Sequence, residues 1–449
     1  MARDPERDRF TGRAARFAKV GAGLSGAAMT FGANRLFAGG DVQARNAKAL
    51  KETLGTLKGP LMKIAQIMAT IPDLLPPEFA EQFAELQTNA PSMGPAFVRR
   101  RLVAELGPNW AARFGEFSLT PAAAASLGQV HRATTLDGQP LAVKLQYPDM
   151  QSAVESDLGQ LRTLLAVGRQ MFAAIDTREI AVEIAERIRE ELDYEREAKA
   201  MALYANFFAD REDIAAPVAF PELSTGRLLS MSWLEGRGLM QFLDTDQDQR
   251  NRIARQLFAA WWAPLIRIGV IHGDPHLGNY SFGGEGERLN LLDFGCIRIF
   301  PPSFVGGVAM LYRAIIDDER EAQAEAYRKW GFKGLTNDLI DVLNMWARFI
   351  FGPFLDDRVR TVADGVSPAM YGRREAFAVK QALETKGPVT IPREFVFMDR
   401  AAIGLGAAFL RLRAELNWRE MFEASLEGFS EDALAARQAA ALSAVGLTG

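Results

Sequence analysis

The feature that most constrains this chain is the spacing of three polar residues in its second half. Asp274 is followed five residues later by Asn279, and Asp293 comes fourteen residues after that, inside the stretch LLDFG. Phosphoryl transfer needs a carboxylate that orients the attacking hydroxyl or water, and an amide and a carboxylate that hold Mg²⁺. Each motif alone would be read as an ordinary turn, but their order and separation match the catalytic and metal-binding loops of kinases. The spacing therefore predicts Asp274 as a catalytic residue and Asn279 and Asp293 as metal ligands.

A run of small residues earlier in the chain, AAAASLGQV, has the spacing of the kinase glycine-rich loop G-x-G-x-x-G-x-V. Ala123 and Ala125 stand where the first two glycines belong, and Gly128 and Val130 match the third glycine and the valine. Alanine disfavours positive φ and keeps its methyl group near a ligand, so we expect a nucleotide loop that binds phosphate in an altered pose. The predicted nucleotide-contacting residues are Ala123, Ala124, Ala125, Ser126, Gly128, Val130, Lys144 and Met231.

Lys144 lies in the apolar stretch LAVKLQYP, fourteen residues after Val130. A lysine in such a strand must direct its ammonium group at an anion. The acidic stretch EIAERIREELDYEREAKA follows it, within a segment that we expect to form one long helix over 177–208. We expect Glu197 to pair with Lys144 within about 4 Å, with both residues in catalytic roles. Three further acidic side chains of this stretch, Glu183, Glu186 and Glu190, are expected on a solvated face of the helix.

The hydrophobic pattern changes along the chain in a way that indicates an α+β fold. Apolar residues recur at three- and four-residue spacing after residue 41, which predicts helices. QVHRATTLDGQPLAVKLQYP then reads as strand, turn and strand, with Asp137-Gly138 at the turn, and APVAFPEL and RLLSMSWLEG indicate two more strands. From about residue 246 the chain is predicted to be helical, except for strands and loops from Ile271 to Ile299.

These patterns predict a bilobal architecture with a small β-sheet lobe and a helical lobe. A chain of 449 residues is long enough for two or three domains or for one bilobal enzyme. We expect a basic, Gly/Ala-rich segment at 1–40, a helical extension at 41–112, a small-sheet lobe at 113–237 and a helical lobe at 238–449.

Composition narrows the partners and the compartment. The formal net charge of -4 gives no reason to expect nucleic-acid binding. Cys296 is the only cysteine, so neither an internal disulfide nor a cysteine-based zinc site can form, and a reducing compartment fits. The first residues, MARDPERDRF, have no apolar core of a signal peptide, and we expect a cytoplasmic location.

The first forty residues carry a local excess of positive charge. From Arg9 to Gly40 there are five basic residues and no acidic one, and the uncharged run Val20 to Asn34 is shorter than the about 20 residues that a membrane span needs. The stretch GAGLSG within it matches a dinucleotide fingerprint, but no βαβ unit surrounds it. We expect reversible attachment to an anionic membrane face, with a disordered tail or a helix docked on the protein body as the alternatives.

Taken together, these motifs resemble the ABC1/ADCK/UbiB family of atypical kinase-like proteins, from about residue 42 to beyond residue 300. The alanine-rich stretch AAAASLGQVHRA is the most specific part of the resemblance. The K-x-G-Q motif of the family is present as KIAQ, with Lys63 and Gln66, and its E-x-D motif as Glu191 and Asp193. This chain departs from the family pattern at Ala65, which replaces the motif glycine, and it shows no C-terminal pair of hydrophobic spans.

The resemblance implies a kinase-like fold whose N-terminal helical extension covers the substrate cleft. It implies a gating role for Lys63, Gln66, Glu191 and Asp193. Lys63 and Gln66 stand at i and i+3, so we expect the helix face that they share to point toward Glu191 and Asp193; the alternative is an ordinary amphipathic helix with a solvent-exposed lysine. It also implies binding of ATP or ADP with Mg²⁺, behaviour closer to an ATPase than to a protein kinase, and a link to ubiquinone or other lipid metabolism at membranes. The implied partners are a nucleotide and either an anionic membrane lipid or a quinone-type lipid, while protein partners stay open.

Three functions follow from these residues. The first is an ATP-hydrolysing, kinase-like enzyme that supports isoprenoid-quinone synthesis. The second is a nucleotide-binding regulator without turnover, which the presence of Asp274, Asn279 and Asp293 disfavours because a pure binder needs fewer of them. The third is a small-molecule phosphotransferase similar to the aminoglycoside and choline kinases, which the alanine loop and the KIAQ extension disfavour.

Overall fold

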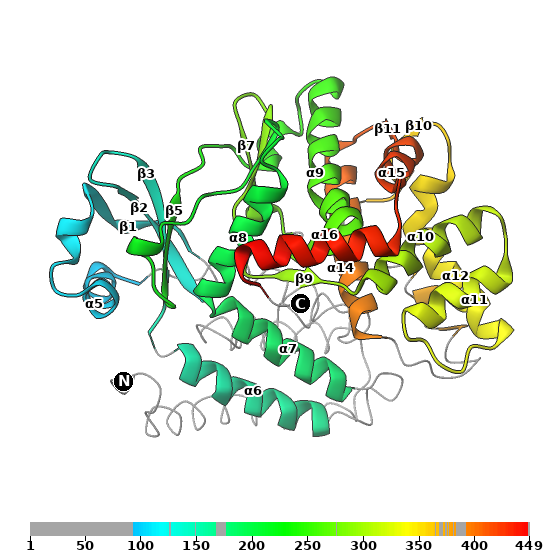
Figure 1. The fold of residues 1–449 in the computed structure, drawn as a ribbon, viewed down its shortest axis with the longest axis horizontal. Coiled ribbons are helices and arrows are strands. Elements are labelled where there is room, and N and C mark those ends of the chain that lie inside the picture. The colour runs from blue at the N-terminus through cyan, green and yellow to red at the C-terminus, as the bar shows by residue number, and fades with distance from the viewer. Residues whose placement is uncertain are drawn as a thin grey trace, which may run out of the picture. The chain divides into compact units, whose positions relative to one another are not determined.

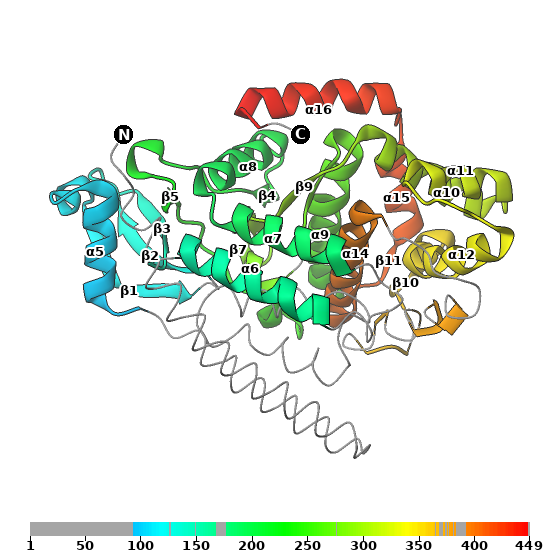
Figure 2. The same cartoon turned by 90° about the horizontal axis from the view of Figure 1, so that it is seen from below.

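The structure is a computed structural model of the 449-residue chain, shown in Figure 1 and, turned by 90°, in Figure 2. It describes residues 93–124, 127–148, 150–167, 177–274, 276–363, 365–367, 371–372, 375, 377–379, 381–382 and 392–447. The expected N-terminal segment and most of the expected extension, including Lys63, Ala65 and Gln66, lie outside these residues, as do Ala125 and Ser126.

The chain divides into two compact units. The first comprises Met1–Glu197 and Ala219–Trp233, and the second comprises Ala198–Val218 and Leu234–Gly449. The domain boundaries expected from the sequence stay predictions.

The described part of the first unit is built on an antiparallel sheet with the strand order β1-β2-β3-β5. Its strands are β1 (Glu116–Ala124), β2 (Gly128–Thr134), β3 (Pro140–Gln146) and β5 (Leu228–Ser232). The β2–β3 turn forms at Asp137-Gly138 as predicted, because Gly138 adopts φ +86° and Thr135 N–H donates to the Gln139 carbonyl at 2.9 Å. This turn fixes the register that sets Val130 opposite Lys144.

Strand β3 is buried at every residue after Pro140, including the polar residues Lys144 and Gln146. One face carries Val143 and Leu145, which pack in a core cluster with Val98 and Leu102 of helix α5 (Pro95–Leu106). Because side chains alternate along a strand, Lys144 and Gln146 share the opposite face.

Three helices follow the hairpin: α6 (Met150–Val167), α7 (Thr177–Glu191) and α8 (Tyr194–Phe207). Helices α6 and α7 lie side by side in both views and bury Val154, Leu158, Ile184 and Ile188 between them. The prediction of a single helix over 177–208 is wrong. The helix is interrupted at Leu192 and Asp193, between the end of α7 and the start of α8. Asp193 begins α8 as its N-cap: its side chain accepts a hydrogen bond from Arg196 N–H at 2.9 Å.

The expected strand APVAFPEL is also wrong. The short strand β4 (Ile214–Ala215) ends just before this stretch, and within it Pro221–Leu223 forms a 3₁₀ turn. Prolines at 217 and 221 have no N–H to donate to a ladder, and Ala219 makes a single bridge to Met231. The other expected strand in this region is confirmed as β5.

Helix α9 (Gln247–Ile268) of the second unit leads into the predicted strand-loop region, which is confirmed. Asp246 caps its start by accepting from Gln249 N–H, and Gly269 ends it at φ +64°. Strands β6 (Val270–His272) and β9 (Ile297–Ile299) pair with each other, and β7 (Tyr280–Gly283) and β8 (Arg288–Leu291) form a hairpin whose β8 also pairs with β4.

Most of the remaining described chain is helical, as expected. Its helices are α10 (Pro302–Ile316), α11 (Arg320–Lys329), α12 (Asn337–Phe351), α14 (Arg393–Leu412), α15 (Trp418–Leu426) and α16 (Glu431–Val445), and the short strands β10 (Val359–Arg360) and β11 (Leu416–Asn417) pair with each other. Among the described residues, no helix has the length and apolar character needed to cross a membrane.

Gly128, at the start of β2, has no room for a side chain, because neighbouring atoms occupy the position of a Cβ atom. A Cβ atom there would lie 2.3 Å from the Leu145 carbonyl oxygen and 3.0 Å from the Tyr194 hydroxyl. The first of these distances is shorter than any real contact of a Cβ atom, and the Leu145 carbonyl belongs to the neighbouring strand. The close approach of β2 to β3 therefore depends on this glycine.

Replacing the cap, Asp193→Ala, should lower the free energy of unfolding by about 1 kcal/mol, because a side-chain acceptor for the first turn of α8 is lost. Chemical denaturation followed by circular dichroism measures this loss. Asp193→Asn keeps the acceptor and removes only the charge, so it should stay within a few tenths of a kcal/mol of the wild type. An equal loss in both variants would contradict the capping role.

Gly128→Ala should lower the free energy of unfolding by about 1–3 kcal/mol, because β2 and β3 must separate to admit the methyl group. A thermal melt compares it with Gly159→Ala, an exposed position in α6 where a Cβ would meet no atom within 4 Å. Alanine is the better helix former, so the control should be neutral or more stable. Melting temperatures that move together would show that the space around Gly128 does not limit packing.

Candidate active site

The predicted ion pair between Lys144 and Glu197 is confirmed. Lys144 Nζ lies 2.7 Å from one carboxylate oxygen of Glu197 and 2.9 Å from the other, so the ammonium donates to both. Both residues are buried, with exposed fractions of 9% and 2%. Strand β3 and helix α8 are thus joined by a desolvated charge pair inside the first unit.

An aromatic ring also lies close to the lysine. The Tyr194 ring centroid lies 5.2 Å from Lys144 Nζ, within the range of a cation–π contact. Tyr194 stands three residues before Glu197, so both side chains leave the same face of α8. Sequence reasoning missed Tyr194, although its i, i+3 spacing from Glu197 was the available signal.

The described residues of the alanine-rich stretch lie at the end of β1 and the start of β2, and β2 pairs with the strand that carries Lys144. Ala123 pairs with Val130 and Ala124 with Gln129 in the ladder, and Ala123 and Ala124 are exposed. The hairpin therefore presents small side chains to its surroundings. Its contact with a nucleotide, like that of the buried Met231 on β5, stays a prediction.

Gln129, on β2, is a second residue that the sequence did not reveal as part of the site. Its side-chain oxygen accepts from Met93 N–H at 2.8 Å, and its nitrogen donates to the Met93 carbonyl at 3.3 Å. The nitrogen also contacts the ring of His131 at 2.9 Å. Burial lowers the pKa of His131, so the uncharged ring is favoured inside the sheet. These contacts join the chain before α5 to β2.

In the second unit, main-chain hydrogen bonds hold the predicted catalytic loop against the D-F-G segment. Gly273 N–H donates to the Cys296 carbonyl at 2.6 Å, and Leu292 N–H donates to the Asn279 carbonyl at 3.0 Å. The buried His272 Nε2–H donates to the Asp293 carbonyl, which ties the end of β6 to the D-F-G segment. Both loops are therefore fixed to each other next to Asp293.

Side chains of the same loops have the chemistry that a hard cation prefers. Asn279 donates its Nδ2–H to the Asp274 carbonyl at 3.1 Å, which orients the amide and leaves its oxygen as an acceptor group. Asp293 is half-buried, and its Oδ1 accepts from Gly295 N–H at 2.9 Å. An amide oxygen and a carboxylate fit Mg²⁺.

Asp274 itself is half-buried in the loop that follows β6. Burial raises the pKa of the Tyr280 hydroxyl, and the negative charge of Asp274 raises it further. Tyr280 therefore keeps its proton near neutral pH behind this carboxylate. His276, unassigned by the sequence, is exposed and accepts from Gly278 N–H through Nδ1 at 3.1 Å.

The predicted gating residues are only partly within the described chain. Glu191 is the last residue of α7 and half-buried, and Asp193 is the exposed cap of α8. Because Lys63 and Gln66 lie outside the described residues, their contact with Glu191 and Asp193 stays a prediction.

Comparison with known proteins places these features in one family. The ABC1 atypical kinase-like domain matches residues 85–327, more than half of the chain. Curated relatives include the mitochondrial atypical kinase COQ8B of Rattus norvegicus, 28% identical over 84% of this chain and 71% of the relative, and the chloroplastic ACTIVITY OF BC1 COMPLEX KINASE 8 of Arabidopsis thaliana, 31% identical over 83% and 49%. The mitochondrial atypical kinase COQ8 of Saccharomyces cerevisiae is 28% identical over 58% of this chain and 52% of the relative.

For several of these relatives, the match spans only about half of their length. Among solved structures, Rv3197 of Mycobacterium tuberculosis, determined with erythromycin, is similar with a TM-score of 0.59 and 26% identity over 87% of this chain and 96% of that chain. The α+β, bilobal kinase-like fold expected from the sequence is confirmed. The chain belongs to the ABC1 atypical kinase-like family, as the order of its motifs indicated.

Proposed function

We propose that this protein binds ATP or ADP with Mg²⁺ and acts as an atypical kinase-like ATPase or phosphotransferase. The observation that carries the proposal is the buried Lys144–Glu197 pair, in which Lys144 Nζ is 2.7 Å from the carboxylate. Taking two charges out of water is costly, and apolar residues of similar volume often stabilise a fold equally well. In kinases the equivalent pair positions the lysine for the nucleotide phosphates, which gives such a pair a reason to persist.

The second unit supplies the complementary groups. In the proposed reaction, Asp274 orients the attacking hydroxyl or water and accepts its proton. Asn279 and Asp293 would hold Mg²⁺, which neutralises charge on the phosphates when bound. The hydrogen bond from Asn279 to the Asp274 carbonyl keeps the base and the metal-binding amide in one loop geometry.

The hairpin of small residues gives the proposal its specific character. Exposed Ala123 and Ala124, with Ala125, Ser126, Gly128 and Val130, are proposed to face the phosphates, and Met231 to contact the base. A methyl group at the positions of the missing glycines limits how closely the backbone approaches phosphate. We therefore expect a nucleotide pose that favours hydrolysis or a restricted acceptor over transfer to generic proteins.

The biological setting that fits this family is ubiquinone or other lipid metabolism. The relatives named COQ8B and COQ8 are mitochondrial and the relative from Arabidopsis thaliana is chloroplastic. The basic residues before Gly40 support peripheral contact with an anionic membrane face, because each is worth about 1 kcal/mol near such a surface. A quinone-type lipid is the proposed acceptor or ligand class.

Asp293→Asn should abolish Mg²⁺-dependent nucleotide binding, because it removes the charged metal ligand. A thermal-shift titration with Mg-ATP measures the affinity, with Asp244→Asn, an exposed carboxylate of the same unit, as the control that keeps the shift. In cells that lack the protein, the wild type but not Asp293→Asn should restore quinone content. Unchanged Mg-ATP affinity in Asp293→Asn would refute the metal assignment.

Ala123→Gly should raise the affinity for ATP, because the loop can then approach the phosphates more closely. A preference of ~1 kcal/mol corresponds to about fivefold tighter binding. Ala122→Gly, at the preceding exposed position of β1, adds the same backbone freedom outside the glycine pattern and should leave the affinity unchanged. Equal or weaker binding in Ala123→Gly would mean that this loop does not touch phosphate as proposed.

A further inference from the structure

The break between α7 and α8 leaves a main-chain carbonyl that the helices do not use. At the end of α7, Leu192 N–H donates to the Arg189 carbonyl at 3.2 Å and Asp193 N–H donates to the Glu190 carbonyl at 3.0 Å. Helix α8 starts with hydrogen bonds to Asp193. The Leu192 carbonyl lies between the two ladders, in a residue that is only 6% exposed, and a buried carbonyl needs a donor.

Gln146 provides that donor. Its Nε2–H donates to the Leu192 carbonyl at 2.7 Å, and its side chain is buried with 3% exposed. Gln146 stands two residues after Lys144 on the same face of β3. Strand β3 therefore reaches the start of α8 twice, through a charged contact at Glu197 and a neutral contact at Leu192.

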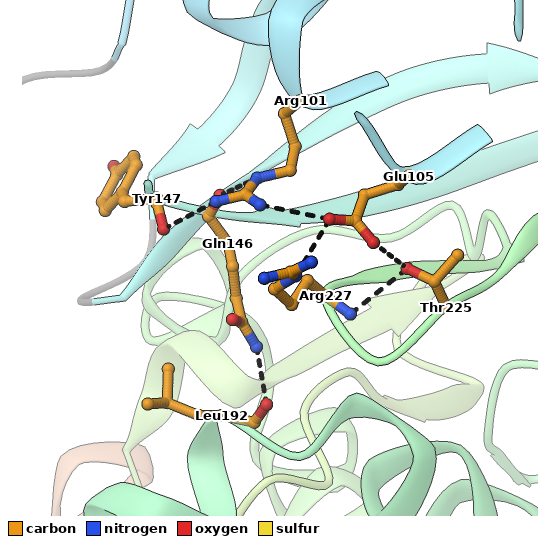
Figure 3. Close-up of polar contacts among 7 residues, drawn as sticks. All are labelled: Arg101, Glu105, Gln146, Tyr147, Leu192, Thr225 and Arg227. Atoms are coloured by element: carbon orange, nitrogen blue, oxygen red, sulfur yellow. Dashed lines mark hydrogen bonds and ion pairs between the residues drawn. The ribbon is translucent and has the colours of Figure 1, made fainter. Parts of the chain in front are cut away.

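Gln146 is in turn held by helix α5, as Figure 3 shows. Arg101 donates through Nε to the Gln146 carbonyl at 3.2 Å and through Nη2 to the Tyr147 carbonyl at 3.1 Å. Arg101 is 5% exposed, so its guanidinium fixes two consecutive peptide groups at the end of β3 from a buried position.

The positive charge of Arg101 is compensated nearby. Glu105 Oε1 accepts from Arg101 Nη1 at 3.1 Å and from Arg227 Nε at 2.9 Å, and its second oxygen accepts from the Thr225 hydroxyl at 2.7 Å. The Glu105 side chain is 6% exposed. A buried charge network is costly when partly satisfied, and here the carboxylate has three donors.

The geometry points to Gln146 as a positioning residue: its amide holds the α7–α8 junction at Leu192 and thereby sets where Glu197 meets Lys144. Arg101 extends this control to α5, so a displacement of α5 reaches the ion pair through the peptide groups at the end of β3. The inference rests on the proposed function only for the measurement of nucleotide affinity, whereas the measurement of hydrogen exchange does not depend on it.

Gln146→Met in the full-length chain tests the inference, because methionine keeps the length of the side chain and removes the donor. Hydrogen exchange of amides 193–197 should become about fivefold faster, and Mg-ATP affinity about fivefold weaker, the effect of one lost hydrogen bond. Gln146→Asn, which keeps the amide but is one methylene too short, should show the same increase in exchange.

The matched control is Gln323→Met. Gln323 is also buried and donates to a main-chain carbonyl, that of Ala314 at 2.9 Å, in the second unit. The Gln323→Met protein should be less stable than the wild type, but hydrogen exchange of amides 193–197 and nucleotide affinity should be unchanged. The same exchange pattern in Gln323→Met and Gln146→Met would overturn the inference, because it would reflect general loosening.

A double substitution separates positioning from direct contact. If Gln146 acts through the ion pair, Gln146→Met should add no further loss of affinity in a Lys144→Met background, and fully additive losses would overturn the inference. Wild-type protein that fails to bind Mg-ATP would refute the proposed function alone, and the exchange at 193–197 would still decide the role of Gln146. Unchanged hydrogen exchange of amides 193–197 in both Gln146 variants would overturn the positioning role of Gln146, whether or not the protein binds nucleotide.

Discussion

The arrangement of the first unit depends on the desolvated contact between Lys144 and Glu197. Each buried charge costs several kcal/mol in lost hydration, so the contact is tolerated only with close geometry and further polar or aromatic support. Here both carboxylate oxygens lie within 3 Å of the ammonium, and the Tyr194 ring adds a cation–π contact. Because neither charge can be left unpaired, strand β3 and helix α8 are constrained to move together.

This constraint explains the break that separates α7 from α8. A continuous helix through Leu192 would fix the direction of α8 by the direction of α7. The break, with Asp193 as a new cap, lets α8 take its own direction toward Lys144. Buried main-chain groups that lose their helix partners at such a break must find others, and Gln146 supplies one of them. The E-x-D motif thus contains a helix junction whose aspartate caps the second helix, a role that is independent of gating.

Much of the fold could be predicted from the sequence, because local chemistry determines it. The turn at Asp137-Gly138, the apolar strand around Lys144 and the pairing with Glu197 follow from turn preference, periodicity and the need to neutralise a buried lysine. The break in the long helix was not predicted. Asp193 is a typical N-cap residue, but the charged helical pattern continues on both sides of it, and the donor to the Leu192 carbonyl, Gln146, is 46 positions away. The nucleotide contact of Gly128 stays a prediction, and the steric reason for a glycine there, the approach of the Leu145 carbonyl, is not revealed by any local pattern.

The proposed catalytic loop and the D-F-G segment of the second unit illustrate a different way to position side chains. Gly273 donates to the Cys296 carbonyl, Leu292 to the Asn279 carbonyl and His272 to the Asp293 carbonyl, so backbone acceptors fix the loops. A side chain can then change without releasing the loop that carries it. An asparagine at position 293 can still accept from Gly295 N–H, as Asp293 Oδ1 does at 2.9 Å, while it lacks the negative charge that a divalent cation requires. Loss of nucleotide binding after that exchange therefore reports on charge at the site, separately from the folding of the loop.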